Sequence, residues 1–64
     1  MDIKIGDTIK ILEMQGEPHY SGRSGKVDHI DAMGQIHGSW GGLAIIPGKD
    51  KIKIINRGAE KWQR

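Results

Sequence analysis

The stretch Thr8-Ile9-Lys10-Ile11-Leu12 decides the fold class, because polar and apolar side chains alternate along it. Successive side chains of a strand point to opposite faces, so Ile9 and Ile11 would share one face. Isoleucine is β-branched and packs well on a pleated surface. Residues 8–12 are therefore predicted to form the first long strand of a sheet.

Four further short strands are predicted beyond this one, at residues 26–30, 35–40, 43–46 and 49–56. Glycine and proline separate them, and a long glycine-rich loop at 13–25 follows the first strand. This pattern predicts an all-β fold, a small five-stranded SH3-like barrel over residues 1–56. Residues 57–64 are predicted to be a C-terminal tail or a short helical turn.

Composition limits the class of protein. Sixty-four residues make one small domain, and such a domain buries only about 60% of the surface of its unfolded chain. A deep substrate cleft is therefore not expected. The absence of cysteine excludes disulfides and thiolate sites.

No apolar run approaches the ~20 residues of a membrane span, and the start MDIKIGDTIK lacks a signal-peptide core. A cytoplasmic protein is expected.

A ligand site is predicted around the loop His19-Tyr20-Ser21-Gly22-Arg23-Ser24-Gly25. Arginine can fork a phosphate or stack on a base, tyrosine offers a stacking face, and glycines let backbone N–H groups turn toward an anion. The Lys-Ser/Thr of a Walker loop is missing. The predicted ligand-binding residues are His19, Tyr20, Ser21, Arg23, Ser24, His37 and Trp40. The alternative is structural: Tyr20 caps the barrel, Arg23 is solvated and Trp40 plugs the interior.

Catalysis is not predicted. A nucleophile elbow, Gly-x-Ser-x-Gly, would need glycine two residues before Ser39, and His37 stands there. His29 and His37 could be cross-strand neighbours around the 31–34 turn, but the histidine spacings match no metal motif. The chain is therefore not predicted to be an enzyme, and no metal or cofactor is expected.

The C-terminal half is basic. The net charge is +2, but residues 1–33 carry four basic and six acidic residues, and residues 34–64 carry six basic and two acidic ones. Nucleic-acid phosphates could be contacted by Lys49, Lys51, Lys53 and Arg57. Lysines on an outer strand also block unwanted strand pairing, and this interpretation is favoured because acidic residues are interleaved.

Two isoleucine doublets, Ile45-Ile46 and Ile54-Ile55, place isoleucine on both faces of late strands. Isoleucine on the second face indicates a bulge or a subunit interface, which Met14 and Trp62 could join. A chain this short without disulfides is expected to form a homo-oligomer.

Two longer stretches of the sequence resemble known protein families. The pattern Gly6-Asp7-x-Ile9-x-Ile11, followed by Gly25-Lys26-Val27-x-x-Ile30, resembles the KOW-type beginning of SH3-like barrels in ribosomal proteins and elongation factors. The run DAMGQIHGSWGGLAIIPGKD (31–50) resembles a family of small bacterial and phage domains of unknown function, over about residues 5–55. That resemblance implies an SH3-like barrel and a mobile-element origin, and no reaction. Ser24 departs from the family, which often has proline there.

Three functions are consistent with these observations. The first is a non-enzymatic, oligomeric binder of a nucleotide-like or phosphate-bearing ligand, with which a phage or mobile element would sequester a host signalling nucleotide. The second is a nucleic-acid-binding SH3-like module. The third is a protein-interaction module that inhibits a host protein through its barrel face. We rank the first above the others, and no membrane partner is expected.

Overall fold

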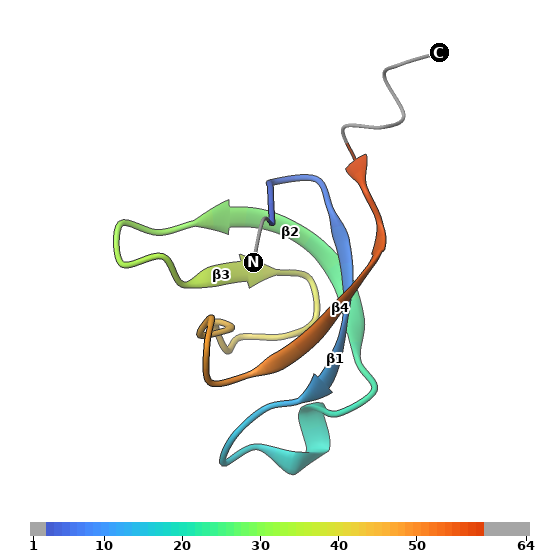
Figure 1. Ribbon diagram of the computed structural model, residues 1–64, viewed down its shortest axis with the longest axis vertical. Coiled ribbons are helices and arrows are strands. Elements are labelled where there is room, and N and C mark those ends of the chain that lie inside the picture. Colours follow the sequence, from blue (N-terminus) through green and yellow to red (C-terminus); the bar gives the residue numbers. More distant parts are fainter. Residues whose placement is uncertain (1–2, 59–64) are drawn as a thin grey trace.

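A computed structural model describes residues 3–58 of the chain as an all-β protein (Figure 1). The elements are β1 (Thr8–Glu13), the 3₁₀ turn η1 (Pro18–Tyr20), β2 (Ser24–Ile30), β3 (Ile36–Gly38) and β4 (Lys51–Asn56). The strands form one sheet in the order β3-β2-β1-β4, and every neighbouring pair is antiparallel. The predicted first strand and the alternation within it are confirmed.

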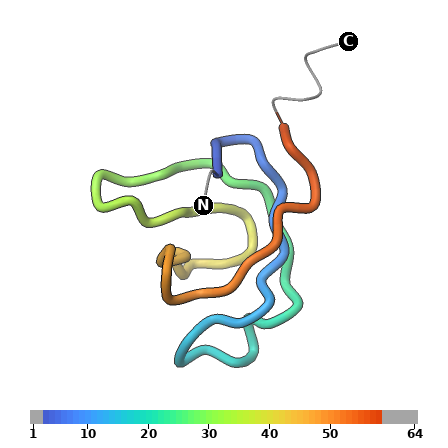
Figure 2. The backbone as a smooth tube through the Cα atoms, viewed as in Figure 1, coloured from blue at the N-terminus to red at the C-terminus, as the bar shows by residue number. Residues whose placement is uncertain are grey.

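The sheet has four strands where the sequence predicted five. Residues 43–46 make only one bridge, in which Ile36 and Ile45 exchange backbone hydrogen bonds of 2.9 and 2.8 Å. This pairing cannot continue past Ile45, because the next residue to exchange hydrogen bonds in an antiparallel pair lies two positions on, at Pro47. Pro47 offers no N–H at all. The Ile46 N–H points away from β3 and donates to the Asp50 carboxylate at 2.9 Å. The described sheet is not closed, and the segment between β3 and β4 lies inside its curl (Figure 2).

The core lies on the concave side of this curl. Ile9 and Ile11 of β1 are fully buried, as is Ile45. In the register with β4, Ile9 lies opposite Ile54 and Ile11 opposite Ile52, and both partners pack against the core half-buried. The core is completed by Ile3, Met14, Val27, Ile36 and Trp40.

Both isoleucine doublets do send one side chain inward and one outward. Ile45 is fully buried and Ile46 is exposed. At the second doublet a register shift places Thr8 opposite Asn56 but Ile9 opposite Ile54, so Ile55 is the extra residue of a β-bulge. Of the two predicted explanations, a bulge or a subunit interface, the bulge is observed at the second doublet. Met14 was expected at an exposed patch, but it is a core residue.

Asp7 joins the start of the described chain to its end. This carboxylate is almost fully buried and accepts hydrogen bonds from the backbone N–H groups of Lys4 at 3.0 Å and Gly58 at 3.2 Å. Arg57 Nη1 lies 3.8 Å from it. Of the C-terminal tail or short helical turn predicted over 57–64, residues 59–64 lie outside the described residues, as does the patch residue Trp62. Within residues 3–58 no helix is long and apolar enough to cross a membrane.

Candidate ligand-binding site

Three of the predicted ligand residues meet in one arrangement, which we call the Arg23 clamp: Tyr20, Arg23 and the backbone carbonyl of Trp40. The Arg23 guanidinium carbon lies 4.1 Å from the centroid of the Tyr20 ring. Arg23 Nη1 donates a hydrogen bond of 3.0 Å to the Trp40 carbonyl. A cation stacked on an aromatic face is attracted by the ring quadrupole, so the guanidinium is held from two directions.

Local structure brings these groups together. Tyr20 ends η1, and the Arg23 N–H donates to the Tyr20 carbonyl at 3.1 Å in a tight turn. Gly22 adopts a φ of +91° within that turn, a conformation that glycine takes without strain. Arg23 then lies beside Ile11, whose N–H donates to the Arg23 carbonyl at 2.7 Å.

Trp40 contributes its backbone and not its ring. Trp40 is 4% exposed, and its indole Nε1–H donates to the Leu43 carbonyl at 2.9 Å. A ring buried in this way cannot stack on a ligand, so the side chain has the alternative role of plugging the interior. This corrects the prediction of Trp40 as a ligand-binding side chain.

Gly41 is a clamp residue that the sequence reasoning missed. Its φ is +150°, and a Cβ there would lie 2.7 Å from the Tyr20 hydroxyl and 3.0 Å from Arg23 Nη1. A side chain at position 41 would displace these groups from the arrangement, and glycine leaves them in place. The Gly41-Gly42 pair was interpreted as a break between strands, and nothing in the sequence indicates which residues the glycine approaches.

The other predicted ligand residues are not part of the clamp. His19 is exposed and lies 3.6 Å from the Glu17 carboxylate, while Ser21 and Ser24 are exposed. His37 lies on β3, directly opposite His29 as predicted, with 5.5 Å between the ring centroids. It therefore belongs to the β2–β3 hairpin and not to the loop site.

The Asp31 carboxylate organises the turn of that hairpin. Its Oδ1 accepts the N–H groups of Met33 and Gln35, both at 2.9 Å, and its Oδ2 lies 3.0 Å from His37 Nε2. The hydrogen bond to His37, followed by that from the Gln35 N–H, lowers the pKa of Asp31 below its ordinary value. Among residues 3–58 no three His, Cys, Asp or Glu side chains are grouped to hold a metal ion.

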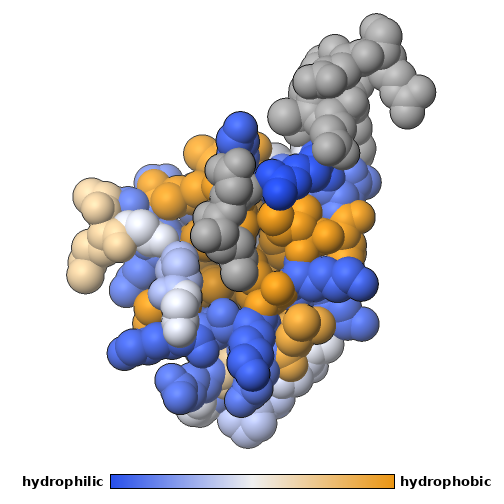
Figure 3. Space-filling model, viewed as in Figure 1, coloured by the Kyte–Doolittle hydropathy of each residue, from blue (hydrophilic) through white to orange (hydrophobic). Residues whose placement is uncertain are grey.

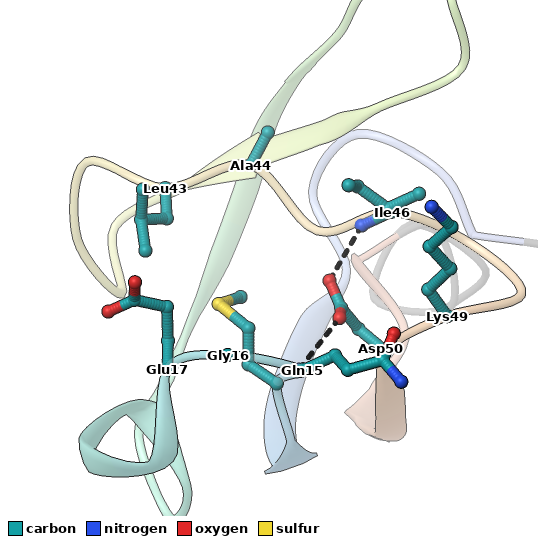
Figure 4. Close-up of a pocket in the computed structure, with 9 residues that line it drawn as sticks. Gln15, Gly16, Glu17, Leu43, Ala44, Ile46, Lys49 and Asp50 are labelled. Carbon is teal, nitrogen blue, oxygen red and sulfur yellow. Dashed lines mark hydrogen bonds between the residues drawn. The ribbon is translucent and has the colours of Figure 1, made fainter.

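A groove of about 390 Å³ lies between the loop after β1 and the segment before β4 (Figure 4). Its floor and walls are largely apolar, formed by Met14, Leu43, Ala44 and Ile46. Glu17 and Leu43 stand at one end, and Lys49 stands at the other. No motif in the sequence marked this groove.

Asp50 holds the two walls of the groove together. Its carboxylate is 7% exposed and accepts the Gln15 N–H at 3.2 Å and the Ile46 N–H at 2.9 Å. Because each oxygen accepts a hydrogen bond from a different wall, this side chain fixes the shape of the groove.

Of the four basic residues of the predicted nucleic-acid site, Lys51 and Lys53 share the exposed face of β4, while Lys49 and Arg57 lie outside that strand. Lys49 lines the groove, and Arg57 lies 3.8 Å from the buried Asp7. Lys51 Nζ lies 3.9 Å from the Glu13 carboxylate. Lys53 faces Lys10 across the strand pair.

The sheet, the clamp and the groove define a small all-β domain that offers a fixed cation beside an apolar recess. The family model of the domain of unknown function DUF4314 matches residues 2–55, and the chain belongs to that family. No curated protein and no solved structure matches the chain.

Proposed function

We propose that the chain is a non-enzymatic cytoplasmic binding module that holds a nucleotide-like or phosphate-bearing ligand at the Arg23 clamp. The scaffold we propose is a partly open SH3-like barrel, in which the 43–46 segment stands where a fifth strand would close the sheet. One observation carries this function: Arg23 is stacked on Tyr20 and anchored to the Trp40 carbonyl while its side chain remains exposed.

Such an arginine is suited to an anion for two reasons. First, its two anchors hold the guanidinium, so less conformational freedom is lost when a ligand binds. Second, only Nη1 is engaged by the anchors, and a guanidinium carries five N–H donors in all. Within residues 3–58 no carboxylate forms an ion pair with Arg23. A phosphate would supply the missing counter-charge.

The groove supports the nucleotide-like part of the proposal. At the end where Glu17 and Leu43 stand, Glu17 continues directly into η1, which carries Tyr20, and the Leu43 carbonyl accepts a hydrogen bond from Trp40 Nε1. The apolar recess and the clamp are therefore built from the same two stretches of chain. Planar, largely apolar groups are bound well by such recesses, and a base beside a phosphate has this combination.

A homo-oligomer is part of the same proposal. Outward-facing apolar side chains are exposed on the described residues, among them Ile5 and Ile55. A domain this small gains stability by covering such groups with a second copy. A sequestering role for a phage or mobile element would follow from tight binding without turnover.

The test is isothermal titration with inorganic phosphate, nucleoside monophosphates, dinucleotides and the matching nucleosides that lack phosphate. The protein should bind a phosphate-bearing member more tightly than its nucleoside. Arg23→Ala should weaken that binding at least tenfold, and Arg23→Lys should weaken it too, because lysine loses the planar fork. Lys4→Ala is the control, since this exposed side chain makes no contact with the clamp.

Either of two results would contradict the proposal. One is equal affinity for nucleoside and nucleotide. The other is an Arg23→Ala variant that binds as tightly as the wild type. Native mass spectrometry on the same samples would report copy number with and without ligand, and a monomer in both conditions would remove the oligomer from the proposal.

A further inference from the structure

We infer that the outer face of the sheet binds the phosphate backbone of duplex nucleic acid through Lys10, Lys26 and Lys53, which we call the lysine face. The strand register assembles this set. Lys10 lies opposite Ser24 on β2 and opposite Lys53 on β4, so these three side chains point to the same side. Lys26 lies opposite Thr8, two residues before Lys10, and shares that side.

Three lysines from three different strands therefore stand on the convex face, away from the core. All three are exposed. Figure 3 shows hydrophilic side chains projecting along the side where β4 lies, with hydrophobic ones between them. Cross-strand partners have Cβ atoms about 4.5–5.5 Å apart and diagonal neighbours about 7–8 Å, so the three charges cover a compact area.

The free protein does not neutralise these charges. No ion pair within residues 3–58 involves Lys10, Lys26 or Lys53. Lys10 and Lys53 directly face each other, and like charges in that position are unfavourable. Two acidic groups lie on the same side, where Glu13 approaches Lys51 at 3.9 Å and Asp28 follows Lys26 after one residue on β2. A dense line of phosphates would relieve the repulsion and release counterions.

The chemistry of this face favours a duplex over a single strand. Proteins that hold single strands stack the bases on aromatic side chains. The aromatic side chains of Tyr20 and Trp40 belong to the clamp and the core, and neither lies on the lysine face. The three lysines contact phosphate and do not read bases, and Asn56, opposite Thr8, is the one amide beside them in the strand register. The binding should therefore depend weakly on sequence and strongly on salt.

This function is separate from the proposed ligand site. Arg23 and Ser24 are consecutive residues, but Arg23 approaches Trp40 on the concave side and Ser24 lies beside Lys10 on the convex side. A duplex on the lysine face would leave the clamp accessible.

The test is fluorescence anisotropy with a labelled 20-base-pair DNA duplex, the matching single strand and vesicles containing anionic lipid, each over a salt series. Three phosphate contacts predict a slope of log K against log salt of about −2.7, or about 40-fold weaker duplex binding at 200 mM than at 50 mM salt. In Lys10→Gln the loss of duplex affinity between 50 mM and 200 mM salt should be only about 12-fold, because one phosphate contact is lost. The triple variant Lys10→Gln, Lys26→Gln, Lys53→Gln should not bind.

The controls separate the lysine face from charge in general and from the clamp. Lys4→Gln and Lys49→Gln each remove one exposed lysine outside the face and should leave the slope unchanged. Arg23→Ala should bind duplex like the wild type even if it has lost ligand binding. The inference is overturned by a wild-type slope near zero, by equal losses in the control variants, by tighter binding of the single strand, or by binding to vesicles without binding to duplex.

Discussion

The two faces of the β1–β4 pair differ sharply although their residues alternate along the same two strands. On the concave face Ile9 meets Ile54 and Ile11 meets Ile52, and the β1 members of both pairs are fully buried. On the convex face Lys10 meets Lys53, and both are exposed. Apolar cross-strand pairs stabilise a sheet, whereas like charges directly opposite destabilise it.

The difference teaches that this sheet is stabilised from one side only. Removal of apolar surface from water supplies the main favourable contribution to folding, at about 25 cal/mol per Å². Only the concave face can provide it, since the convex face is solvated. The convex face is therefore free to carry an arrangement that costs some stability and serves binding. Substitutions at neighbouring positions on opposite faces should have opposite consequences.

The largest expected effect lies on the concave face. Ile11→Ala removes a fully buried side chain and should lower the free energy of unfolding by about 2–5 kcal/mol, through lost transfer energy and the cavity left behind. Leu12→Ala is the matched control, because Leu12 is the next residue and is 50% exposed. It should cost about 0.5 kcal/mol or less. Urea unfolding measures both, and similar losses in the two variants would remove the distinction between the faces.

A smaller effect of opposite sign is expected on the convex face. Lys53→Glu replaces a like-charge pair with an opposite-charge pair at Lys10 and should raise the free energy of unfolding by about 0.2–1 kcal/mol. The gain should shrink with added salt, because exposed charges are screened. The double variant Lys10→Glu, Lys53→Glu restores a like-charge pair and should return to near the wild-type value. A Lys53→Glu protein less stable than the wild type would contradict this.

The smallest effect is expected at the β2–β3 turn, outside the β1–β4 comparison. The folded protein lowers the pKa of Asp31, so the unfolded chain takes up this proton at a higher pH than the folded one. The contribution of Asp31 to stability is therefore complete above its ordinary pKa of 3.8 and is lost as the pH falls through the lowered value.

The pKa of Asp31 can be measured directly by NMR titration of its side-chain carboxyl carbon. Because the hydrogen bond to His37 is the largest cause of the shift, His37→Ala should move the pKa of Asp31 back toward its ordinary value. The N–H groups of Met33 and Gln35 would still hold part of the shift. An unchanged titration in His37→Ala would show that the histidine does not stabilise the carboxylate.

The alternation of apolar and polar residues was sufficient to predict a strand wherever one face of that strand is apolar and the other polar. Residues 8–12 alternate cleanly, and β1 formed there. Ile52 and Ile54 do the same in β4, and His29 and His37 could be placed opposite each other because a short turn lies between them. In each case the side-chain period and the turn length determine the register without reference to distant residues.

The same alternation gave wrong predictions where a group distant in the sequence determines the local structure. Residues 43–46 have a strand-like composition, but they make only one bridge, and the Asp50 carboxylate binds the Ile46 N–H on the side away from β3. Met14 occurs in a polar loop, yet Asp50 also binds the neighbouring Gln15 N–H and holds that loop against the core. Nothing in the sequence around Asp50, which follows the Pro47-Gly48 turn, indicates that its carboxylate binds the N–H groups of Ile46 and Gln15.

The sequence by itself determined that this is a small all-β domain without cysteine chemistry, because composition and alternation act through neighbouring residues. Only the tertiary structure decided that Arg23 would lie over Tyr20 against the Trp40 carbonyl, and that Lys10 would face Lys53. Both arrangements join segments far apart in the chain. Their geometry depends on how the curled sheet and its loops pack, which no local pattern specifies.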